Sequence, residues 1–185
     1  MCFLNLKDLP KINLDNKDAR NYIIEVARYW LEEFEIDGYR LDHSIGSSLD
    51  FWEEFKSEMK SVKRDFALIG EAGKALGSFL KEKFKKEWIE TFWLTKSFSN
   101  KERERVKEIM ERYDLNSCIE FNDLMMKHLE KVLDGCLDFS FGDRINSLAL
   151  NEISREEFEE KLKEHYRKFK ESFALITLAS NHDRG

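Results

Sequence analysis

Residues 38–46 read GYRLDHSIG, a short apolar segment that carries Arg40 and Asp42 two positions apart. A brief apolar run of this length is typical of a buried strand. Because side chains alternate along a strand, Arg40 and Asp42 should share one face, while Tyr39 and Leu41 should point the other way, toward covering helices. The segment therefore predicts a strand whose inner face holds a charged pair.

Helical and strand patterns alternate along the chain on both sides of this segment. Helical patterns cover residues 16–34, 51–59, 74–131 and 154–169. Short apolar runs typical of strands cover residues 38–42, 66–71, 136–141 and 173–180. Strands that are separated by helices predict right-handed βαβ units and a parallel sheet.

Two of the helical patterns make specific predictions about packing. The first is capped by Asn16. Its single apolar face comprises Tyr22, Ile23, Val26, Ala27, Trp30, Leu31 and Phe34. The last opens with a capping box formed by Ser154 and Glu157. The side chains that it is predicted to bury are Phe158, Leu162, Tyr166 and Phe169.

Either a doubly wound sheet or part of a (β/α)8 barrel fits this alternation. The polar residues Asp42, Glu71 and Asp183 each come at or just beyond the C-terminal end of a predicted strand, which is the catalytic face of a TIM barrel. A full barrel needs eight strands and about 250 residues, more than this chain contains. The predicted fold class is therefore α/β: a partial TIM (β/α)8 barrel of about four βα units, with a helical insertion at residues 74–131.

The residue types at two of the strand ends indicate acid–base chemistry. We expect Asp42 to be a buried carboxylate, and a buried carboxylate beside a guanidinium such as that of Arg40 stays ionised and held in place, which suits a nucleophile. Glu71 has no adjacent arginine in the sequence, so we expect burial to raise its pKa, as a general acid requires. This division of labour is that of retaining glycoside hydrolysis. Taken singly, the same residues also fit a buried ion pair, a surface acid and a helix cap at Asp183.

Composition and charge exclude several other classes of protein. The net charge of -6 and the pI of about 5.4 argue against binding to nucleic acid phosphates. Cys2, Cys118 and Cys136 are odd in number and lack C-x-x-C spacing, so neither a disulfide framework nor a zinc site is predicted. The sequence has neither a leader pattern at its start nor an apolar run of about 18 residues. We therefore expect a soluble cytoplasmic protein with no metal site.

Four short motifs occur in the order typical of one enzyme family. They are LPKIN at residues 9–13, GYRLD at 38–42, IGE at 69–71 and SNHD at 180–183. LPKIN resembles the M-P-K-L-N motif of the neopullulanase, cyclomaltodextrinase and maltogenic amylase branch of the alpha-amylase family, glycoside hydrolase family thirteen. The other three resemble the second, third and fourth conserved regions of that family. The resemblance implies that residues 1–185 are a fragment of the catalytic (β/α)8 barrel, equivalent to its strands four to seven.

The resemblance also implies roles for five residues. Asp42 would be the nucleophile, Glu71 the acid/base, and Asp183 the carboxylate that stabilises the transition state. Arg40 would orient the nucleophile, and His182 would assist in binding the sugar.

The sequence departs from the family pattern just after Asp42. Ile45 and Gly46 stand where the family often has Lys-His or Asn-Glu, which puts the family's calcium site in doubt. The resemblance therefore implies no cofactor in this chain and leaves calcium open for the full-length parent enzyme. His43 should point away from the barrel axis by strand parity, so we expect it to pack against or support its neighbours.

The implied function is that of a retaining glycoside hydrolase acting on an alpha-glucan. It would cleave α-1,4 and, as a wider option, α-1,6 glucosidic bonds in malto-oligosaccharides, cyclodextrins or starch. The alternatives are a family transferase, branching or trehalose-forming, and a non-catalytic amylase-like binding module. Half a barrel exposes sheet edges, so we expect part of a longer or split enzyme, inactive alone, whose partner is the missing barrel half or a second copy. No nucleic acid or membrane partner is expected.

Overall fold

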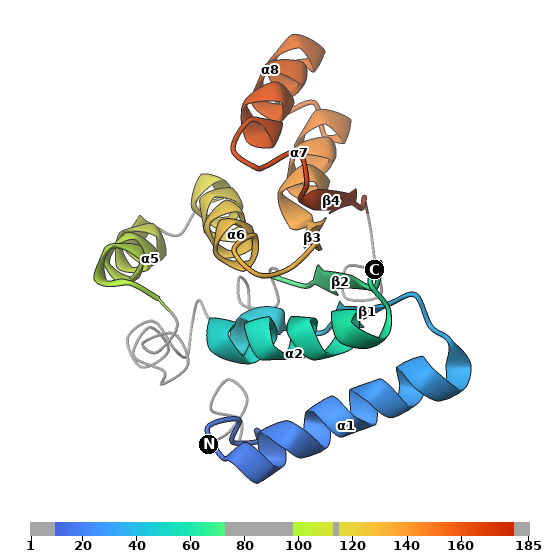
Figure 1. The fold of residues 1–185 in the computed structure, drawn as a ribbon. Coiled ribbons are helices and arrows are strands. Elements are labelled where there is room, and N and C mark those ends of the chain that lie inside the picture. The colour runs from blue at the N-terminus through green and yellow to red at the C-terminus, as the bar shows by residue number, and fades with distance from the viewer. Residues whose placement is uncertain (1–9, 73–97, 113–114, 180–185) are drawn as a thin grey trace.

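Helices and strands alternate in the computed structural model, which describes residues 10–72, 98–112 and 115–179 (Figure 1). The elements are α1 (Lys17–Phe34), β1 (Gly38–Leu41), the 3-10 turn η2 (Ser44–Gly46), α2 (Leu49–Val62), β2 (Ala67–Gly70), α5 (Asn100–Arg112), α6 (Leu115–Leu129), β3 (Gly135–Asp138), α7 (Phe139–Ala149), α8 (Arg155–Tyr166) and β4 (Ala174–Thr177). The predicted helical segment 74–131 is therefore helical in α5 and α6, and its residues 74–97 lie outside the described part.

The four described strands form one parallel sheet in the order β1-β2-β3-β4. Its register pairs Gly38 with Ala67, Ile69 with Gly135, and Gly135 with Ala174. Figure 1 shows the strands following one another from β1 beside α2 to β4 beside α7. Each strand pairs with the next strand in sequence, as in a barrel, whereas a doubly wound sheet reverses its order. The prediction of a partial (β/α)8 barrel is confirmed.

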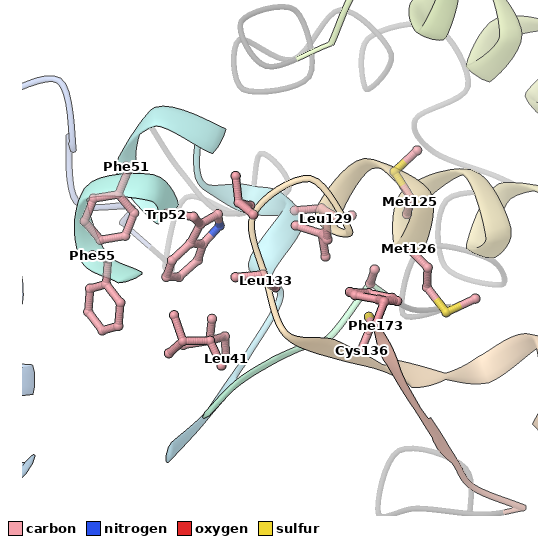
Figure 2. Packing of buried hydrophobic residues seen from close by; sticks show 14 of the residues in the cluster. Leu41, Phe51, Trp52, Phe55, Met125, Met126, Leu129, Leu133, Cys136 and Phe173 are labelled. Atoms are coloured by element: carbon pink, nitrogen blue, oxygen red, sulfur yellow. The ribbon is translucent and has the colours of Figure 1, made fainter. Parts of the chain in front are cut away.

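One apolar core lies between the sheet and its helices (Figure 2). The largest fully buried side chains are Phe51, Phe66, Ile45, Met59, Leu68, Ile109, Met125, Met126 and Leu129. They come from α2, β2, α5, α6 and the connections after β1 and α2. As predicted, Tyr39 faces the helices, and its hydroxyl donates to the carbonyl of Ala27 in α1 at 2.9 Å. The other face of β1 is therefore left to Arg40.

The apolar face of α1 is divided between the core and the surface. Ile24, Ala27 and Leu31 are buried. Five large apolar residues of the same helix are exposed, namely Tyr22, Val26, Tyr29, Trp30 and Phe34. The indole of Trp30 stacks on the ring of Phe34, with 4.8 Å between ring centroids. Among the described elements α1 packs mainly on α2, so only part of the predicted apolar face is buried.

Two boundary predictions are corrected by local hydrogen bonds. The strand predicted at residues 136–141 ends at Asp138, because Oδ1 of Asp138 accepts from the N–H of Phe141 and caps α7. The capping box of α8 is present in part, since Oγ of Ser154 accepts from the N–H of Glu157 at 3.1 Å. On that helix Tyr166 is exposed, and the fully buried residue is its neighbour His165. The prediction of a buried Tyr166 is therefore wrong.

Candidate active site

The C-terminal ends of β1 and β2 bring Arg40, Asp42 and Glu71 together. Arg40 pairs with Ile69 in the sheet register, so Asp42 and Glu71, each two residues further on, leave the sheet at the same edge. Nη1 of Arg40 contacts Oδ1 of Asp42. Nη2 of the same guanidinium lies 2.7 Å from Oε1 of Glu71. One arginine thus joins the predicted nucleophile to the predicted acid/base.

The three side chains differ in their exposure to solvent. The side chain of Asp42 is 77% exposed, that of Arg40 is 38% exposed, and that of Glu71 is 13% exposed. We expected Asp42 to be a buried carboxylate, and this is wrong. The reason is that Asp42 follows an edge strand, beyond which the described part of the chain places no further strand.

The prediction that Glu71 lacks an arginine neighbour is also wrong. Arg40 is close to Asp42 in the sequence but not to Glu71. Because β1 and β2 are neighbouring parallel strands, the guanidinium of Arg40 nevertheless contacts Glu71 as well as Asp42. A cation at 2.7 Å favours the ionised form of a carboxyl group and opposes the effect of burial. The contact with Arg40 therefore opposes the rise in pKa that burial was expected to cause at Glu71.

The turn after β1 wraps around Glu71. The backbone N–H of His43 donates to Oε2 of Glu71 at 3.2 Å. The N–H and the hydroxyl of Ser44 both donate to the main-chain carbonyl of Glu71, at 3.0 and 2.9 Å. The N–H of Glu71 donates in turn to the carbonyl of Leu41 at 3.0 Å, and the indole of Trp52 donates to the carbonyl of Ser44 at 2.8 Å. Both the backbone and the carboxylate of Glu71 are thus fixed.

His43 has a left-handed backbone and packs as predicted. Its φ is 42° and its ψ is 49°. A Cβ added to Gly46 would lie 2.8 Å from Cδ2 of His43, so the ring occupies space that only a glycine leaves open. Burial, helped by the charge of Lys11 and opposed by that of Asp42, lowers the pKa of His43 to about 4. The ring is therefore neutral at neutral pH.

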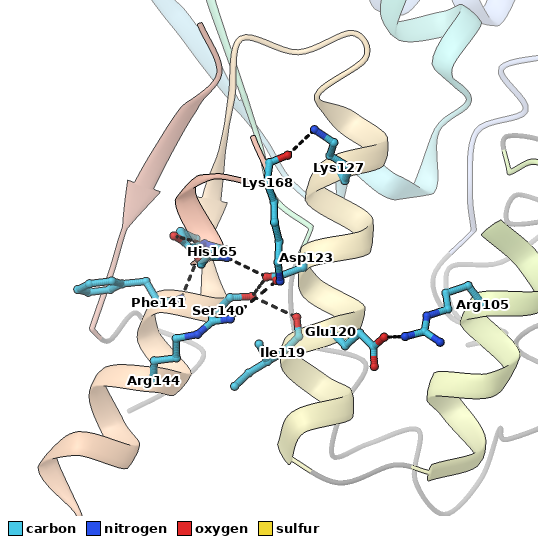
Figure 3. Close-up of polar contacts among 11 residues, drawn as sticks. Arg105, Ile119, Glu120, Asp123, Lys127, Ser140, Phe141, Arg144, His165 and Lys168 are labelled. Atoms are coloured by element: carbon cyan, nitrogen blue, oxygen red, sulfur yellow. Dashed lines mark hydrogen bonds and ion pairs between the residues drawn. The ribbon is translucent and has the colours of Figure 1, made fainter. Parts of the chain in front are cut away.

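Figure 3 shows Asp123, Ser140, His165 and Lys168 side by side in a buried charged cluster, which could not be recognised from the sequence. Asp138, at the end of β3, belongs to the same cluster. Nε2 of His165 lies 2.9 Å from Oδ2 of Asp138, and Nδ1 lies 3.1 Å from Oδ1 of Asp123 on α6. Oγ of Ser140 donates to Oδ1 of Asp123 at 2.6 Å, and Nζ of Lys168 lies 2.7 Å from Oδ2. The sequence signal that could have identified the cluster is an aspartate, Asp138, at the end of a strand and before a helix. Its partner His165, and Asp123 beyond it, are distant in the sequence.

The cluster shifts the titration of its members. Burial acts to lower the pKa of His165, but hydrogen bonds and charge from Asp123 and Asp138 outweigh it and raise that pKa. Burial acts to raise the pKa of Asp123, yet His165, Lys168 and Ser140 together lower it to about 2. The raised pKa favours the protonated form of His165, which links α8 to Asp123 on α6 and to Asp138 at the end of β3.

The remaining predicted site residues, His182 and Asp183, lie outside the described residues. Their convergence with Asp42 and Glu71 stays a prediction. Within residues 10–72, 98–112 and 115–179, no group of three His, Cys, Asp or Glu side chains is arranged to hold a metal ion. In that part of the chain no helix is both long enough and apolar enough to cross a membrane.

A sequence model of the family described as Alpha amylase, catalytic domain, matches residues 2–185. The chain belongs to this family. It is 36% identical over 122 residues to Alpha-amylase 2 of Dictyoglomus thermophilum, covering 60% of this chain and 21% of that protein. It is 44% identical over 63 residues to the Maltogenic alpha-amylase of Bacillus acidopullulyticus, covering 34% of this chain and 11% of that protein. The chain thus spans about a fifth or less of the length of these curated relatives.

Solved structures support the same fold. The crystal structure of an Anoxybacillus alpha-amylase superimposes with a TM-score of 0.63 at 24% identity, covering 95% of this chain and 29% of that one. A noncanonic maltogenic alpha-amylase from Thermotoga neapolitana gives a TM-score of 0.59 at 19% identity, covering 95% of this chain and 29% of its own. At these identities the likeness shows the fold alone.

Proposed function

We propose that this chain forms part of the catalytic barrel of a retaining glycosidase. The proposed substrate is an alpha-glucan, and the proposed bonds are α-1,4 glucosidic bonds in malto-oligosaccharides, cyclodextrins or starch, with α-1,6 bonds as a wider option. The observation that carries the proposal is that Arg40 contacts both Asp42 and Glu71 at the C-terminal edge of neighbouring parallel strands. The names of similar proteins support the substrate class, since they include a Cyclomaltodextrinase of Geobacillus thermopakistaniensis.

The proposed mechanism uses the two carboxyl groups in turn. The carboxylate of Asp42 attacks the anomeric carbon while Glu71 protonates the departing glycosidic oxygen, which breaks the C–O bond and leaves a glycosyl ester. Water then attacks the same carbon and gives its proton to Glu71, which releases the sugar and the carboxylate of Asp42. Asp183 and His182 contribute to transition-state stabilisation and sugar binding. No cofactor is proposed for this chain, and calcium is left open for the full-length parent.

Arg40 has opposite effects on the two steps of this mechanism. Its guanidinium contacts and orients Asp42, the proposed nucleophile. Its contact with Glu71 favours the ionised form of that carboxyl group, whereas the proposed general acid must carry a proton.

The partner of this chain is proposed to be the missing half of the barrel. Two features of the same region support this: β1 is an edge strand among the described strands, and α1 beside it exposes an aromatic face. A preceding βα unit would pair with the edge and cover the face. A second copy of the chain is the competing occupant. An Intracellular maltogenic amylase of Bacillus subtilis is among the relatives, which supports a cytoplasmic location.

Trapping of the covalent intermediate tests the catalytic proposal. The chain is mixed with the complementary part of Alpha-amylase 2 of Dictyoglomus thermophilum, and the complex is treated with a 5-fluoro-α-glucosyl fluoride. Mass spectrometry is expected to find the sugar on Asp42, with no label on the Asp42→Asn variant. Glu71→Gln should lower hydrolysis of an unactivated malto-oligosaccharide by at least about a hundredfold. Labelling at another residue, or unchanged activity in Asp42→Asn, would contradict the mechanism.

A further inference from the structure

We propose that Ser44 is a positioning residue that sets the place of Glu71 relative to Asp42, because its hydroxyl and its N–H hold the main chain of Glu71 from the turn that follows Asp42. The inference rests on the proposed function only in giving Asp42 and Glu71 their catalytic parts. Ser44 lies two residues after Asp42 and is fully buried. Its hydrogen bonds to Glu71 are geometric properties of the chain, whatever the reaction.

Both peptide planes that flank Glu71 are held by β1 and its turn. The N–H of Glu71, which belongs to the plane before its Cα, donates to the carbonyl of Leu41 at 3.0 Å. The carbonyl of Glu71, which belongs to the plane after its Cα, accepts from the N–H of Ser44 at 3.0 Å and from its hydroxyl at 2.9 Å. Because each peptide group is planar, fixing both planes fixes φ and ψ of Glu71. The direction in which its side chain leaves the backbone is thereby set.

Ser44 is itself held by groups outside the turn. Its carbonyl accepts from the indole N–H of Trp52 on α2 at 2.8 Å, and this contact is buried. A Cβ added to Gly70 would lie 2.8 Å from Oγ of Ser44, so the hydroxyl occupies space that the glycine before Glu71 leaves open. The hydroxyl is therefore confined by packing as well as by its hydrogen bond, and Ser44 links α2 to Glu71.

The consequence is a fixed spacing between the two proposed catalytic residues. Asp42 precedes Ser44 by two residues, so one short segment carries the nucleophile and also holds the main chain of the acid/base. Retaining hydrolysis requires carboxyl groups about 5–5.5 Å apart. Arg40 contacts the ends of both side chains, whereas the hydrogen bonds of Ser44 determine where the side chain of Glu71 starts.

Removal of the hydroxyl tests the contact directly. Ser44→Ala deletes the donor at Oγ and leaves the N–H of residue 44 in place. In the 185-residue chain we expect the main-chain carbonyl 13C resonance of Glu71 to move upfield, because that oxygen loses one of its two donors. We also expect the side-chain pKa of Glu71, followed by its carboxyl 13C resonance, to rise by roughly 0.3 to 1 unit, since a looser Glu71 contacts Arg40 and the N–H of His43 less well.

Ser140→Ala is the matched control. Ser140 is also fully buried, but its hydroxyl donates to Asp123 on α6 at 2.6 Å rather than to Glu71. Its loss should lower stability without moving either resonance of Glu71, which separates a local effect from a general loosening of the fold. An unmoved carbonyl resonance in Ser44→Ala, a moved one with an unchanged pKa, or an equal rise of that pKa in Ser140→Ala would each overturn the proposal.

Trp52→Phe replaces Ser44→Ala if that variant does not give a folded spectrum. Phenylalanine keeps an aromatic ring but removes the donor to the carbonyl of Ser44. The pKa of Glu71 should then rise in the same direction by a smaller amount, and no rise would overturn the proposal. The titrations require no enzyme activity, so an inactive complex with the expected shifts would contradict the catalytic proposal and leave the positioning role standing.

Discussion

Nη2 of Arg40 lies 2.7 Å from Oε1 of Glu71, across two neighbouring strands of the sheet. The same guanidinium contacts Asp42 on its own strand. The contact between strands makes the charge state of Glu71 depend on Arg40.

Replacing Arg40 with glutamine should therefore make Glu71 easier to protonate. Removing a cation from this distance is expected to raise the pKa of Glu71 by about one unit or more. The measurement is the carboxyl 13C titration of the free chain. The control is Arg28→Gln, because Arg28 also pairs with two carboxylates, Glu32 and Glu58, but lies on α1. An unchanged titration of Glu71 in the Arg40 variant would show that the ion pair does not form in solution.

His165→Leu should strongly destabilise the fold. The side chain of His165 is fully buried between Asp123 and Asp138, so its loss leaves two buried carboxylates without their shared cation. Breaking a buried pair in this way typically costs about 3–5 kcal/mol of unfolding free energy. Urea unfolding followed by circular dichroism measures the loss. The control Lys163→Ala, on the exposed side of the same helix, should change stability by less than about 0.5 kcal/mol.

The contribution of His165 to stability should decrease as the pH rises. Its pKa is raised in the folded chain, so it binds its proton more tightly when folded; this stabilisation is complete below the ordinary value of 6.5 and is lost as the pH rises through the raised pKa of the folded state. The measurement is the difference in unfolding free energy between wild type and His165→Asn, followed from about pH 5 to about pH 9. A difference that is constant or grows with pH would contradict a raised pKa.

Asp123 and His43 also change the pH dependence of stability, which is why the difference in unfolding free energy between wild type and the His165 variant is measured. Asp123 has a pKa lowered to about 2, so its stabilisation is present above its ordinary value of 3.8 and is lost as the pH falls toward 2. His43 has a pKa lowered to about 4, so its environment favours the folded state above pH 6.5 and less so as the pH falls toward 4. The two histidines therefore act in opposite directions, and only subtraction of a His165 variant isolates its effect.

Charging the exposed face of α1 should block assembly without unfolding the chain. Trp30 is 47% exposed and Phe34 is 56% exposed, so lysines at both positions remain in water in the free chain. We expect the double variant to sediment as a monomer and to bind the complementary barrel half at least about tenfold more weakly. The control is Glu33→Lys, which adds the same type of charge at an exposed position between them. Unchanged association of the double variant would place the partner elsewhere.

The elements of the fold could be predicted from the sequence because each is encoded locally. Apolar spacing located the strands and helices, and strand parity placed Tyr39 and Arg40 on opposite faces. The predicted end of β3 was wrong because Asp138 caps α7. The apolar residues that follow Asp138 fit a strand as well as the start of a helix, so the sequence pattern did not show where the strand ends. The partners of His165 could not be predicted, because Asp123 and Asp138 come from elements that are distant in the sequence.

The candidate site was predicted in its membership but not in its electrostatics. Arg40, Asp42 and Glu71 do meet at one sheet edge, as strand-end positions indicated. The contact between Arg40 and Glu71 forms because β1 and β2 are neighbours in the sheet. The spacing of Arg40 and Asp42 along one strand does not reveal it. The exposure of Asp42 depends on what lies beyond β1, which local sequence does not specify.

The strand order β1-β2-β3-β4 has a consequence for how this polypeptide acquires its structure during synthesis. Each strand after β1 joins a neighbour that has already left the ribosome, so the sheet can grow by one unit at a time. The pairing of Ile69 with Gly135 closes a much longer stretch of chain than the pairing of Gly38 with Ala67, so we expect it to form more slowly. His165 can form its contacts only late in synthesis, because it pairs with Asp123 on α6 and Asp138 at the end of β3, which leave the ribosome earlier.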